Sequence, residues 1–125
     1  QAFGDRDQSL GYLERCLAAD NDNISCLWYR GTIQTVMGDQ AGALASFRAL
    51  MQTDTQVPRH FLDAGRAYMN SGDCASAVPI LQMGYALQQN SSSYNPDREA
   101  LFEEYLADCG APVTLPQAEA TEEAS

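Results

Sequence analysis

Two stretches decide the fold of this chain: residues 36–47, VMGDQAGALASF, and residues 70–81, NSGDCASAVPIL. Each contains a Gly-Asp pair, and a third pair lies near the start of the sequence: Gly38-Asp39, Gly72-Asp73 and Gly4-Asp5. The three pairs are 34 residues apart each time. A fixed period between about 20 and 50 residues is typical of proteins built from stacked repeats.

The same period relates small and apolar residues around these turns. Gly31 is matched by Gly65, and further pairs at the same spacing are Ala43 with Ala77 and Phe47 with Leu81. Between the turns, apolar residues follow the three-and-four spacing of an amphipathic helix, namely Ala43, Leu44, Phe47, Leu50 and Met51. A small residue lets two crossing helices approach closely, which explains Gly31 and Gly65 despite a helix cost of about 1 kcal/mol each.

This pattern resembles the tetratricopeptide repeat family, whose units are antiparallel helix pairs of 34 residues. The residues that match the family's motif in one unit are Leu27, Gly31, Gly38, Asp39, Ala43 and Phe47. Those that match in the next are Phe61, Gly65, Tyr68, Gly72, Asp73, Ala77 and Leu81. Arg30 stands where the family usually has an apolar residue, Gln34 replaces an aromatic, and no proline closes either unit. The match covers residues 4–89. The alternative, an unrelated helical bundle, leaves the three equally spaced turns to coincidence.

The resemblance implies an all-α fold, a right-handed α-solenoid of antiparallel helix pairs. We expect about two full repeats, an N-terminal half repeat and a C-terminal capping helix. Helices are expected at residues 6–19, 24–37, 40–53, 58–71, 74–89 and 96–109. Asn95-Pro96 would start the last helix, and Gly110 followed by proline would end it. A helical domain, 1–110, would then precede an extended acidic tail, 111–125.

The four cysteines fall symmetrically about two expected helix hairpins. The turn near residue 21 would place Cys16 opposite Cys26, and the turn near residue 92 would place Cys74 opposite Cys109. We therefore predict the disulfides Cys16–Cys26 and Cys74–Cys109, which indicate an exported protein, periplasmic or extracellular. Four buried free thiols are the alternative. A zinc site is disfavoured because there is no C-x-x-C and His60 is the only histidine.

Charge and composition exclude several classes of function. The net charge is −10, with seven arginines and no lysine, so nucleic acid and membrane surfaces are disfavoured as partners. No apolar run approaches the length of a membrane span, and no signal segment precedes the first helix, so an exported protein would be seen in its processed form. We find no catalytic motif, and expect no enzyme, metal or cofactor; His60 is expected to be solvated or to cap a helix.

The resemblance also implies a groove lined by the first helix of each pair, which would hold a peptide of a partner protein. The residues carried over to that face are Trp28, Thr32, Thr35, Arg59, Leu62, Arg66 and Met69. An indole beside two guanidinium groups suits an extended acidic peptide. Two alternatives stay open: Trp28 belongs to the core, and the two arginines balance nearby carboxylates.

A second hypothesis concerns the ends of the chain. The first helix resembles the second half of a repeat, and only three residues precede Gly4; the last helix resembles a first half. One molecule's last helix would then dock on another's first, through Leu10, Leu13 and Leu17 on one side and Leu101, Phe102, Tyr105 and Leu106 on the other. Such a contact propagates into a filament unless it closes a ring. The alternatives are a monomeric periplasmic adaptor, an accessory subunit of a larger complex, and a chain shortened upstream.

Two glycosylation-type triplets, at Asn23 and Asn90, fall in equivalent loops between the expected repeats. Such triplets are common by chance, so they indicate exposed loops and not attached sugar.

Overall fold

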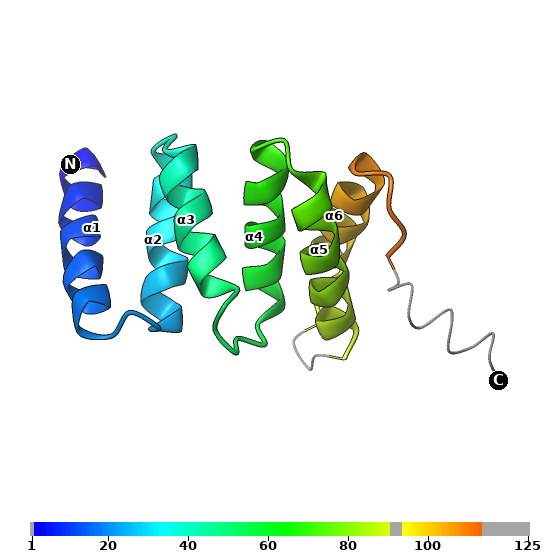
Figure 1. Cartoon of the computed structure of the whole chain (residues 1–125), viewed down its shortest axis with the longest axis horizontal. Coiled ribbons are helices and arrows are strands. Elements are labelled where there is room, and N and C mark those ends of the chain that lie inside the picture. Colours follow the sequence, from blue (N-terminus) through cyan, green and yellow to red (C-terminus); the bar gives the residue numbers. More distant parts are fainter. Residues whose placement is uncertain (1, 91–93, 114–125) are drawn as a thin grey trace. The chain divides into compact units, whose positions relative to one another are not determined.

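The computed structural model describes residues 2–90 and 94–113, which form six α-helices and no strand (Figure 1). The helices are α1 (Ala2–Ala19), α2 (Ile24–Val36), α3 (Gln40–Leu50), α4 (Pro58–Asn70), α5 (Cys74–Gln89) and α6 (Pro96–Asp108). The predicted all-α class is confirmed. Five of the six predicted helices begin at the residue that the sequence predicts, and α3 ends three residues earlier than expected.

The chain divides into two compact units, Gln1–Thr55 with α1, α2 and α3, and Gln56–Ser125 with α4, α5 and α6. Within the first unit α2 packs on α3 and on α1. Within the second, α5 packs on both α4 and α6, and α6 also contacts α4. Each unit is therefore a helix pair with one additional helix.

Each Gly-Asp turn ends one helix and begins the next. Gly38 and Gly72 have φ values of 82° and 78°, in the left-handed region that glycine occupies without a steric penalty. The following aspartate is the N-cap of the next helix: Asp39 accepts from the N–H of Gly42 at 2.9 Å, and Asp73 accepts from Ser76 at 3.0 Å. Each connection is thus three residues long, 37–39 and 71–73, and the Gly-Asp pair supplies its last two residues.

The third Gly-Asp pair does not form such a turn. Gly4 and Asp5 lie inside α1, which begins at Ala2 and not at residue 6 as predicted. The expectation of a turn here is wrong. The backbone of Gly4 and Asp5 instead continues the helix of Leu10 and its neighbours.

The predicted crossing glycines are confirmed in both units. A Cβ atom on Gly31 would lie 2.7 Å from the ring of Phe47, and one on Gly65 would lie 2.4 Å from Cδ2 of Leu81. Real Cβ atoms essentially never approach so closely, so each helix pair depends on a glycine facing a large side chain. The two contacts are made by residues 34 positions apart.

In the first unit a polar network lies between the paired helices α2 and α3. Arg30 of α2 donates from Nε to the hydroxyl of Ser46 on α3 at 2.8 Å, and this hydroxyl lies 2.6 Å from the side-chain amide of Gln34. Arg30 also forms an ion pair with Glu14 of α1 at 3.4 Å. Ser46 is fully buried. The two departures from the family's pattern, at Arg30 and Gln34, are therefore compensated by one buried hydroxyl.

In the second unit, α6 closes the far side of α5 through another close approach. A Cβ atom on Gly84 would lie 2.6 Å from the ring of Phe102, and both residues are buried. Gln88 is buried and donates to the carbonyl of Asn95 at 3.1 Å, while its oxygen accepts from Arg98 at 2.7 Å. A close approach at Gly84 was not predicted from the sequence, because this residue is not a position of the repeat's motif.

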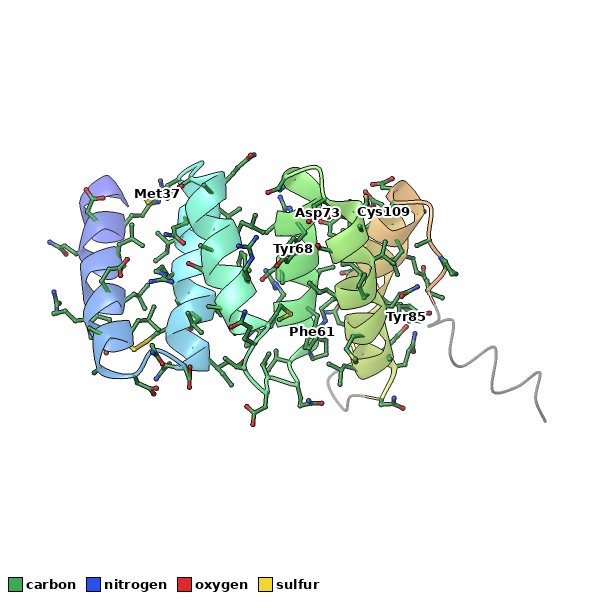
Figure 2. All side chains as sticks on the ribbon, viewed as in Figure 1. Met37, Phe61, Tyr68, Asp73, Tyr85 and Cys109 are labelled. Atoms are coloured by element: carbon green, nitrogen blue, oxygen red, sulfur yellow. A yellow bond between two sulfur atoms is a disulfide. The ribbon has the colours of Figure 1, made fainter. Side chains whose placement is uncertain are left out.

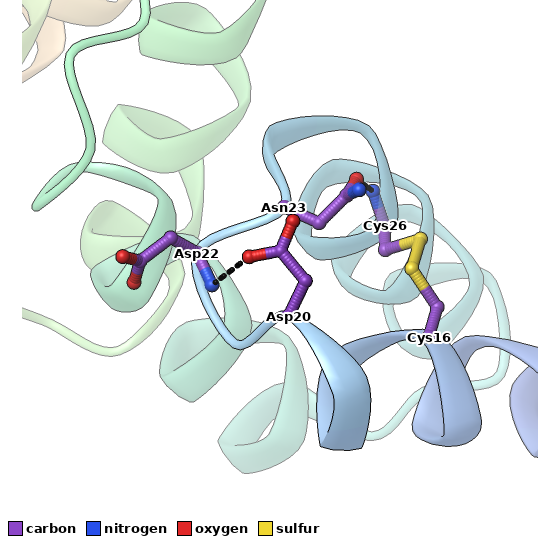
Figure 3. The surroundings of a disulfide bond; sticks show 5 residues. All are labelled: Cys16, Asp20, Asp22, Asn23 and Cys26. Carbon is purple, nitrogen blue, oxygen red and sulfur yellow. Dashed lines mark hydrogen bonds between the residues drawn. A yellow bond between two sulfur atoms is a disulfide. The ribbon is translucent and has the colours of Figure 1, made fainter.

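Both predicted disulfides are present. Cys16 of α1 is bonded to Cys26 of α2 with a Cα–Cα distance of 6.6 Å, and the N–H of Cys26 also donates to the N-cap Asn23 (Figure 3). Cys74, the first residue of α5, is bonded to Cys109 at the end of α6 with a Cα–Cα distance of 5.6 Å. Asp73 and Cys109 accordingly lie at the same end of the second unit (Figure 2). Each bridge joins the additional helix of its unit to the helix pair.

The residues that directly follow α6 remain in contact with the second unit. Gly110 has a φ of 70° and ends the helix as predicted, and the carbonyl of Pro112 accepts from the side chain of Gln82 at 2.9 Å. The rest of the predicted tail, 114–125, lies outside the described residues.

Candidate functional site

The candidate site is a pocket of about 210 Å³ between α4 and α6 in the second unit. It is lined by residues of both helices and of the turn before α6: Arg59, Leu62, Asp63, Arg66, Asn95, Asp97, Arg98, Leu101 and Tyr105. Sites for drug-sized ligands usually enclose about 300–1,000 Å³. This pocket is therefore of a size for one or two side chains and not for a large cofactor.

Helical spacing places the α4 residues on one face. Leu62 and Asp63 lie three and four residues after Arg59, and Arg66 lies three residues after Asp63, which places all four along one side of the helix. Pro58 occupies the first turn of α4, where its missing N–H costs nothing. Leu62 is buried and forms the floor of the pocket, not an exposed part of a groove as predicted.

The α6 residues are positioned by the start of that helix. Asn95 is the N-cap and accepts from the N–H of Arg98 at 3.0 Å, and Pro96 fills the first turn. From there Arg98, Leu101 and Tyr105 follow at intervals of three and four residues. Leu101 is 37% exposed, so the pocket has an apolar side next to its charged one.

Charge distinguishes this pocket from the rest of the surface. It gathers three of the seven arginines of a chain whose net charge is −10. Arg59 forms an ion pair with Asp63 at 3.4 Å, and Arg98 donates to Gln88 of α5 at 2.7 Å. Arg66 is exposed and makes no ion pair within the described part of the chain. Its guanidinium therefore remains available to a ligand.

His60 lies on the buried side of α4, next to the pocket in sequence. It is 8% exposed, so the expectation of a solvated histidine is wrong. Burial lowers its pKa from the usual value of 6.5; the nearby carboxylate of Asp63 opposes this shift and Arg59 adds to it. Burial in the unit thus favours the neutral form of the imidazole.

The residues predicted for the groove are divided between the two units, and each unit is described by itself. Arg59, Leu62 and Arg66 meet in the pocket, whereas Met69 is half-buried further along α4 and does not line it. Trp28, Thr32 and Thr35 belong to the first unit.

In the first unit the three predicted groove residues have separate environments. Trp28 is half-buried and packs edge-on against Tyr29, with ring centroids 4.9 Å apart. The hydroxyl of Thr32 is buried without a hydrogen-bond partner in the described part of the chain. Thr35 donates to the carbonyl of Gly31 at 2.8 Å, one turn earlier. The hydroxyl of Thr35 is therefore bonded within its own helix, whereas that of Thr32 is buried.

The predicted assembly surface is largely buried within each unit. Leu13 and Leu17 of α1 are buried in the first unit, and Phe102 and Leu106 of α6 are buried in the second. The expectation that they form bare docking faces is wrong, since α1 packs on α2 and α6 packs on α5 and α4. The other members of the set are at least partly exposed, namely Leu10, Leu101 and Tyr105.

A second pocket, apolar in character, lies between α1 and α2 and was missed in the sequence. It measures about 480 Å³ and is lined by Gln8, Ser9, Tyr12, Leu13, Tyr29 and Ile33. Tyr12 and Tyr29 are 63% and 53% exposed. The signal in the sequence was the spacing of Tyr29 and Ile33 along one face of α2, with Tyr12 on the preceding helix.

The lining of the α4–α6 pocket by Asp63 and Arg98 was missed as well; each is one turn from a residue that the prediction named.

The two glycosylation-type asparagines have structural roles. Asn23 caps α2, and Asn90 donates from its side chain to the carbonyl of Ala86 at 3.1 Å. Asn23 is half-buried and Asn90 is exposed. The serines that follow Asn90 lie outside the described residues.

No protein-family model matches the chain, and no curated protein matches it either. Among the residues described, no group of three side chains is arranged to hold a metal ion, and none of the helices is long and apolar enough to cross a membrane.

Proposed function

We propose that this chain is an exported repeat protein of the tetratricopeptide kind, which binds another polypeptide and catalyses no reaction. The observation that carries the proposal is the repetition of one packing contact, Gly31 against Phe47 and Gly65 against Leu81, at the 34-residue period. Repeat proteins stack such pairs into a solenoid whose continuous surface serves as a binding face. In this proposal the two units form a right-handed α-solenoid.

The disulfides support the proposed export. All four cysteines are paired, and structural disulfides persist chiefly in oxidising compartments. The proposed location is therefore the periplasm or the outside of the cell.

Binding of a partner peptide is favoured over end-to-end stacking of copies. The stacking contact would need the apolar residues of α1 and α6, and four of those seven are buried in their own units. The α4–α6 pocket, by contrast, is lined by exposed charged and apolar side chains, and its volume suits the side chains of a peptide. The chain would then act as an adaptor or as an accessory subunit of a larger complex.

Selection from a random peptide library displayed on phage tests this function. The native, oxidised chain should enrich peptides that lose binding to the variant Leu101→Trp, in which a larger ring fills the apolar side of the pocket. The matched control is Leu44→Trp on α3, far in sequence from the pocket and in the other unit. Failure to enrich any peptide, or enrichment that is indifferent to Leu101→Trp, would contradict the proposal.

A second candidate function is self-association through the first unit. It is favoured by one observation, the exposed aromatic and apolar residues of α1 and α2: Tyr12, Tyr29, Val36 and Met37. Two of them, Tyr12 and Tyr29, line one pocket, and contiguous exposed apolar surface is typical of a protein–protein contact. Light scattering over a concentration series should then show an oligomer that Tyr12→Glu converts to a monomer. A monomer at every concentration would exclude this candidate.

A further inference from the structure

The two disulfides join helices that the rest of the fold holds to different extents. We propose that the Cys16–Cys26 bond is a reversible redox site, which a protein dithiol reduces and whose reduction releases α1 from α2. The Cys74–Cys109 bond stays oxidised under the same conditions and keeps α6 in place. The inference goes beyond the proposed function and does not rest on it. It concerns each unit by itself, so it does not depend on how the two units are arranged.

The helix α1 has less support within its unit than α6 has in the other. Among the helices described, α1 packs extensively only on α2, whereas α6 packs on both α5 and α4. The apolar anchors of α1, Leu13 and Leu17, are 5% and 8% exposed. Those of α6, Phe102 and Leu106, are completely buried, and Phe102 also fills the space beside Gly84. The noncovalent contacts of α1 are therefore the weaker set.

Open space beside α1 indicates that its packing is incomplete. The pocket of about 480 Å³ described above lies between α1 and α2. A further pocket, of about 420 Å³, is lined by residues that include Ala18 of α1, Leu27 of α2 and Ala49 of α3. Closely packed helices leave few openings of this size between them. The ion pair from Glu14 to Arg30 adds little, because 60% of the glutamate side chain is exposed and exposed pairs contribute weakly. The Cys16–Cys26 bond is therefore a main attachment of α1 to its unit.

The support of each helix determines how easily its bond is reduced. A fold that keeps two thiols adjacent favours the bond between them, and the bond favours that fold to the same extent. In the second unit α6 would remain on α4 and α5 after reduction, so Cys109 would stay beside Cys74 and the bond would re-form. In the first unit α1 would separate, which moves Cys16 away from Cys26 and makes the dithiol form persist.

The positions of Cys16 and Cys26 give the reaction a direction (Figure 3). Cys16 lies in the last turn of α1 and is half-buried, whereas Cys26 lies in the first turn of α2 and is buried. A reductant therefore reaches the sulfur of Cys16 first. The sulfur of Cys26 leaves as a thiolate, which the positive end of the α2 dipole stabilises.

The exchange is balanced with a dithiol as the only co-reactant. One thiolate of the dithiol attacks Sγ of Cys16, which forms a mixed disulfide and breaks the bond to Sγ of Cys26. The second thiolate then attacks the dithiol's own sulfur in the mixed disulfide and releases Cys16. The bridge accepts two electrons and two protons, and the dithiol loses them as it becomes a disulfide.

Release of α1 changes the surface of the first unit. Leu13 and Leu17 are covered while α1 lies on α2, and Tyr29 at this contact is already exposed. Separation would expose the two leucines together with the facing side of α2. A larger contiguous apolar surface is typical of an interaction site, so the redox state of one bond would control whether the unit presents such a site.

The test uses the full, oxidised chain in mixtures of reduced and oxidised dithiothreitol, followed by alkylation of free thiols and tryptic mass spectrometry. Cleavage after Arg15 and Arg30 places Cys16 and Cys26 in one peptide, separate from the other two cysteines. We expect the ratio of reduced to oxidised form to be at least about tenfold higher for the first bond than for the second.

Hydrogen–deuterium exchange of the same samples follows the helix. Reduction of the first bond should make the amides of α1 exchange at least about tenfold faster, while α2, α3 and α6 keep their protection. The variant Cys16→Ser with Cys26→Ser should show this exchange without a reductant. Its matched control, Cys74→Ser with Cys109→Ser, should keep both α1 and α6 protected.

A variant that fills the open space tests the cause. Ser9→Leu adds an apolar side chain to the α1–α2 pocket, so it should lower the reduced-to-oxidised ratio of the first bond by at least about threefold. Ala19→Leu is the control and should leave the ratio unchanged, because Ala19 is exposed on the same helix and lines neither pocket.

Four results would overturn the inference. Equal reduction of the two bonds, or earlier reduction of the second, would show that the support of the helix does not set the ratio. An α1 that stays protected after reduction would make the bond dispensable for holding that helix. Loss of protection in α2 and α3 together with α1 would show that the bond holds the whole unit and not one helix. A ratio unaffected by Ser9→Leu, or lowered equally by Ala19→Leu, would remove the packing explanation.

Discussion

The helix pairs α2–α3 and α4–α5 share one backbone plan and fill it in opposite ways. In the first pair Arg30, Gln34 and Ser46 form the polar network described above. The residues 34 positions later are Ala64, Tyr68 and Ile80, so the same space in the second pair is occupied by apolar side chains. Both pairs therefore share the crossing glycine and the Gly-Asp turn and differ in the chemistry of the three positions between their helices.

The largest expected difference between the units lies in their disulfides. Replacement of Cys74 and Cys109 by serine should lower the free energy of unfolding by about 3.8 kcal/mol, and replacement of Cys16 and Cys26 by about 2.7 kcal/mol. The reason is the length of chain that each bridge closes, 35 residues in the second unit and 10 in the first. Urea denaturation of the two double variants measures both values. A larger loss from the shorter loop would contradict this account.

The polar network offers a sharper test of the comparison. Ser46→Ile alone should destabilise the protein by about 2.5 kcal/mol, because Arg30 and the Gln34 amide lose their buried partner. Combined with Arg30→Ala and Gln34→Tyr, which copies the second pair, it should recover most of that loss. Midpoints of urea denaturation provide the measurement. If the triple variant is no more stable than the single one, the two chemistries are not interchangeable.

The two Gly-Asp turns should respond alike. Gly38→Ala and Gly72→Ala should each cost about 1 kcal/mol, because both residues have positive φ while no atom lies near enough to clash with a new Cβ. Gly11→Ala is the control: this helical glycine would place its Cβ 3.7 Å from Arg15, an ordinary contact, so alanine should stabilise α1 by about 1 kcal/mol. If thermal melts showed that all three variants change the melting temperature in the same direction, the backbone explanation would be refuted.

The smallest expected effect concerns position 60 and its counterpart 34 residues earlier. His60 is buried with a lowered pKa, whereas Cys26 is held in a disulfide and does not titrate. The unfolded chain therefore binds more protons than the folded one below pH 6.5, so stability should fall as the pH decreases from 6.5 towards the folded pKa. His60→Gln should remove this contribution to the pH dependence below pH 6.5. If the free energy of unfolding of the variant changed with pH as steeply as before, the pH dependence would belong to other titrating groups.

The backbone plan was predictable from the sequence because it depends on residue types with few substitutes. A left-handed turn residue favours glycine, an N-cap favours aspartate, and a close helix crossing excludes a Cβ atom; Gly38, Asp39 and Gly31 satisfy these demands in turn. The cysteine pairing followed from the same plan, since symmetrical positions about a hairpin lie opposite each other.

The surfaces were harder to predict, because exposure depends on which helix covers which face. The apolar residues of α1 read as unpaired in sequence, yet Leu13 and Leu17 are buried in the first unit, where α1 packs on α2. Phe102 was predicted to dock on another molecule, whereas it fills the space that Gly84 leaves on α5. The pocket required knowledge that α6 contacts α4 as well as α5, and no local pattern carries that information.

The disulfide pattern bears on the order in which the protein can mature. The first cysteine is bonded to the second and the third to the fourth, one of three pairings that four cysteines allow. In the export proposed above, a chain that crossed a membrane with its N-terminus first would present Cys16 and Cys26 together before Cys74 had appeared. An oxidase that joins consecutive cysteines as they emerge would therefore make both native bonds directly, and no isomerase would be needed to correct them.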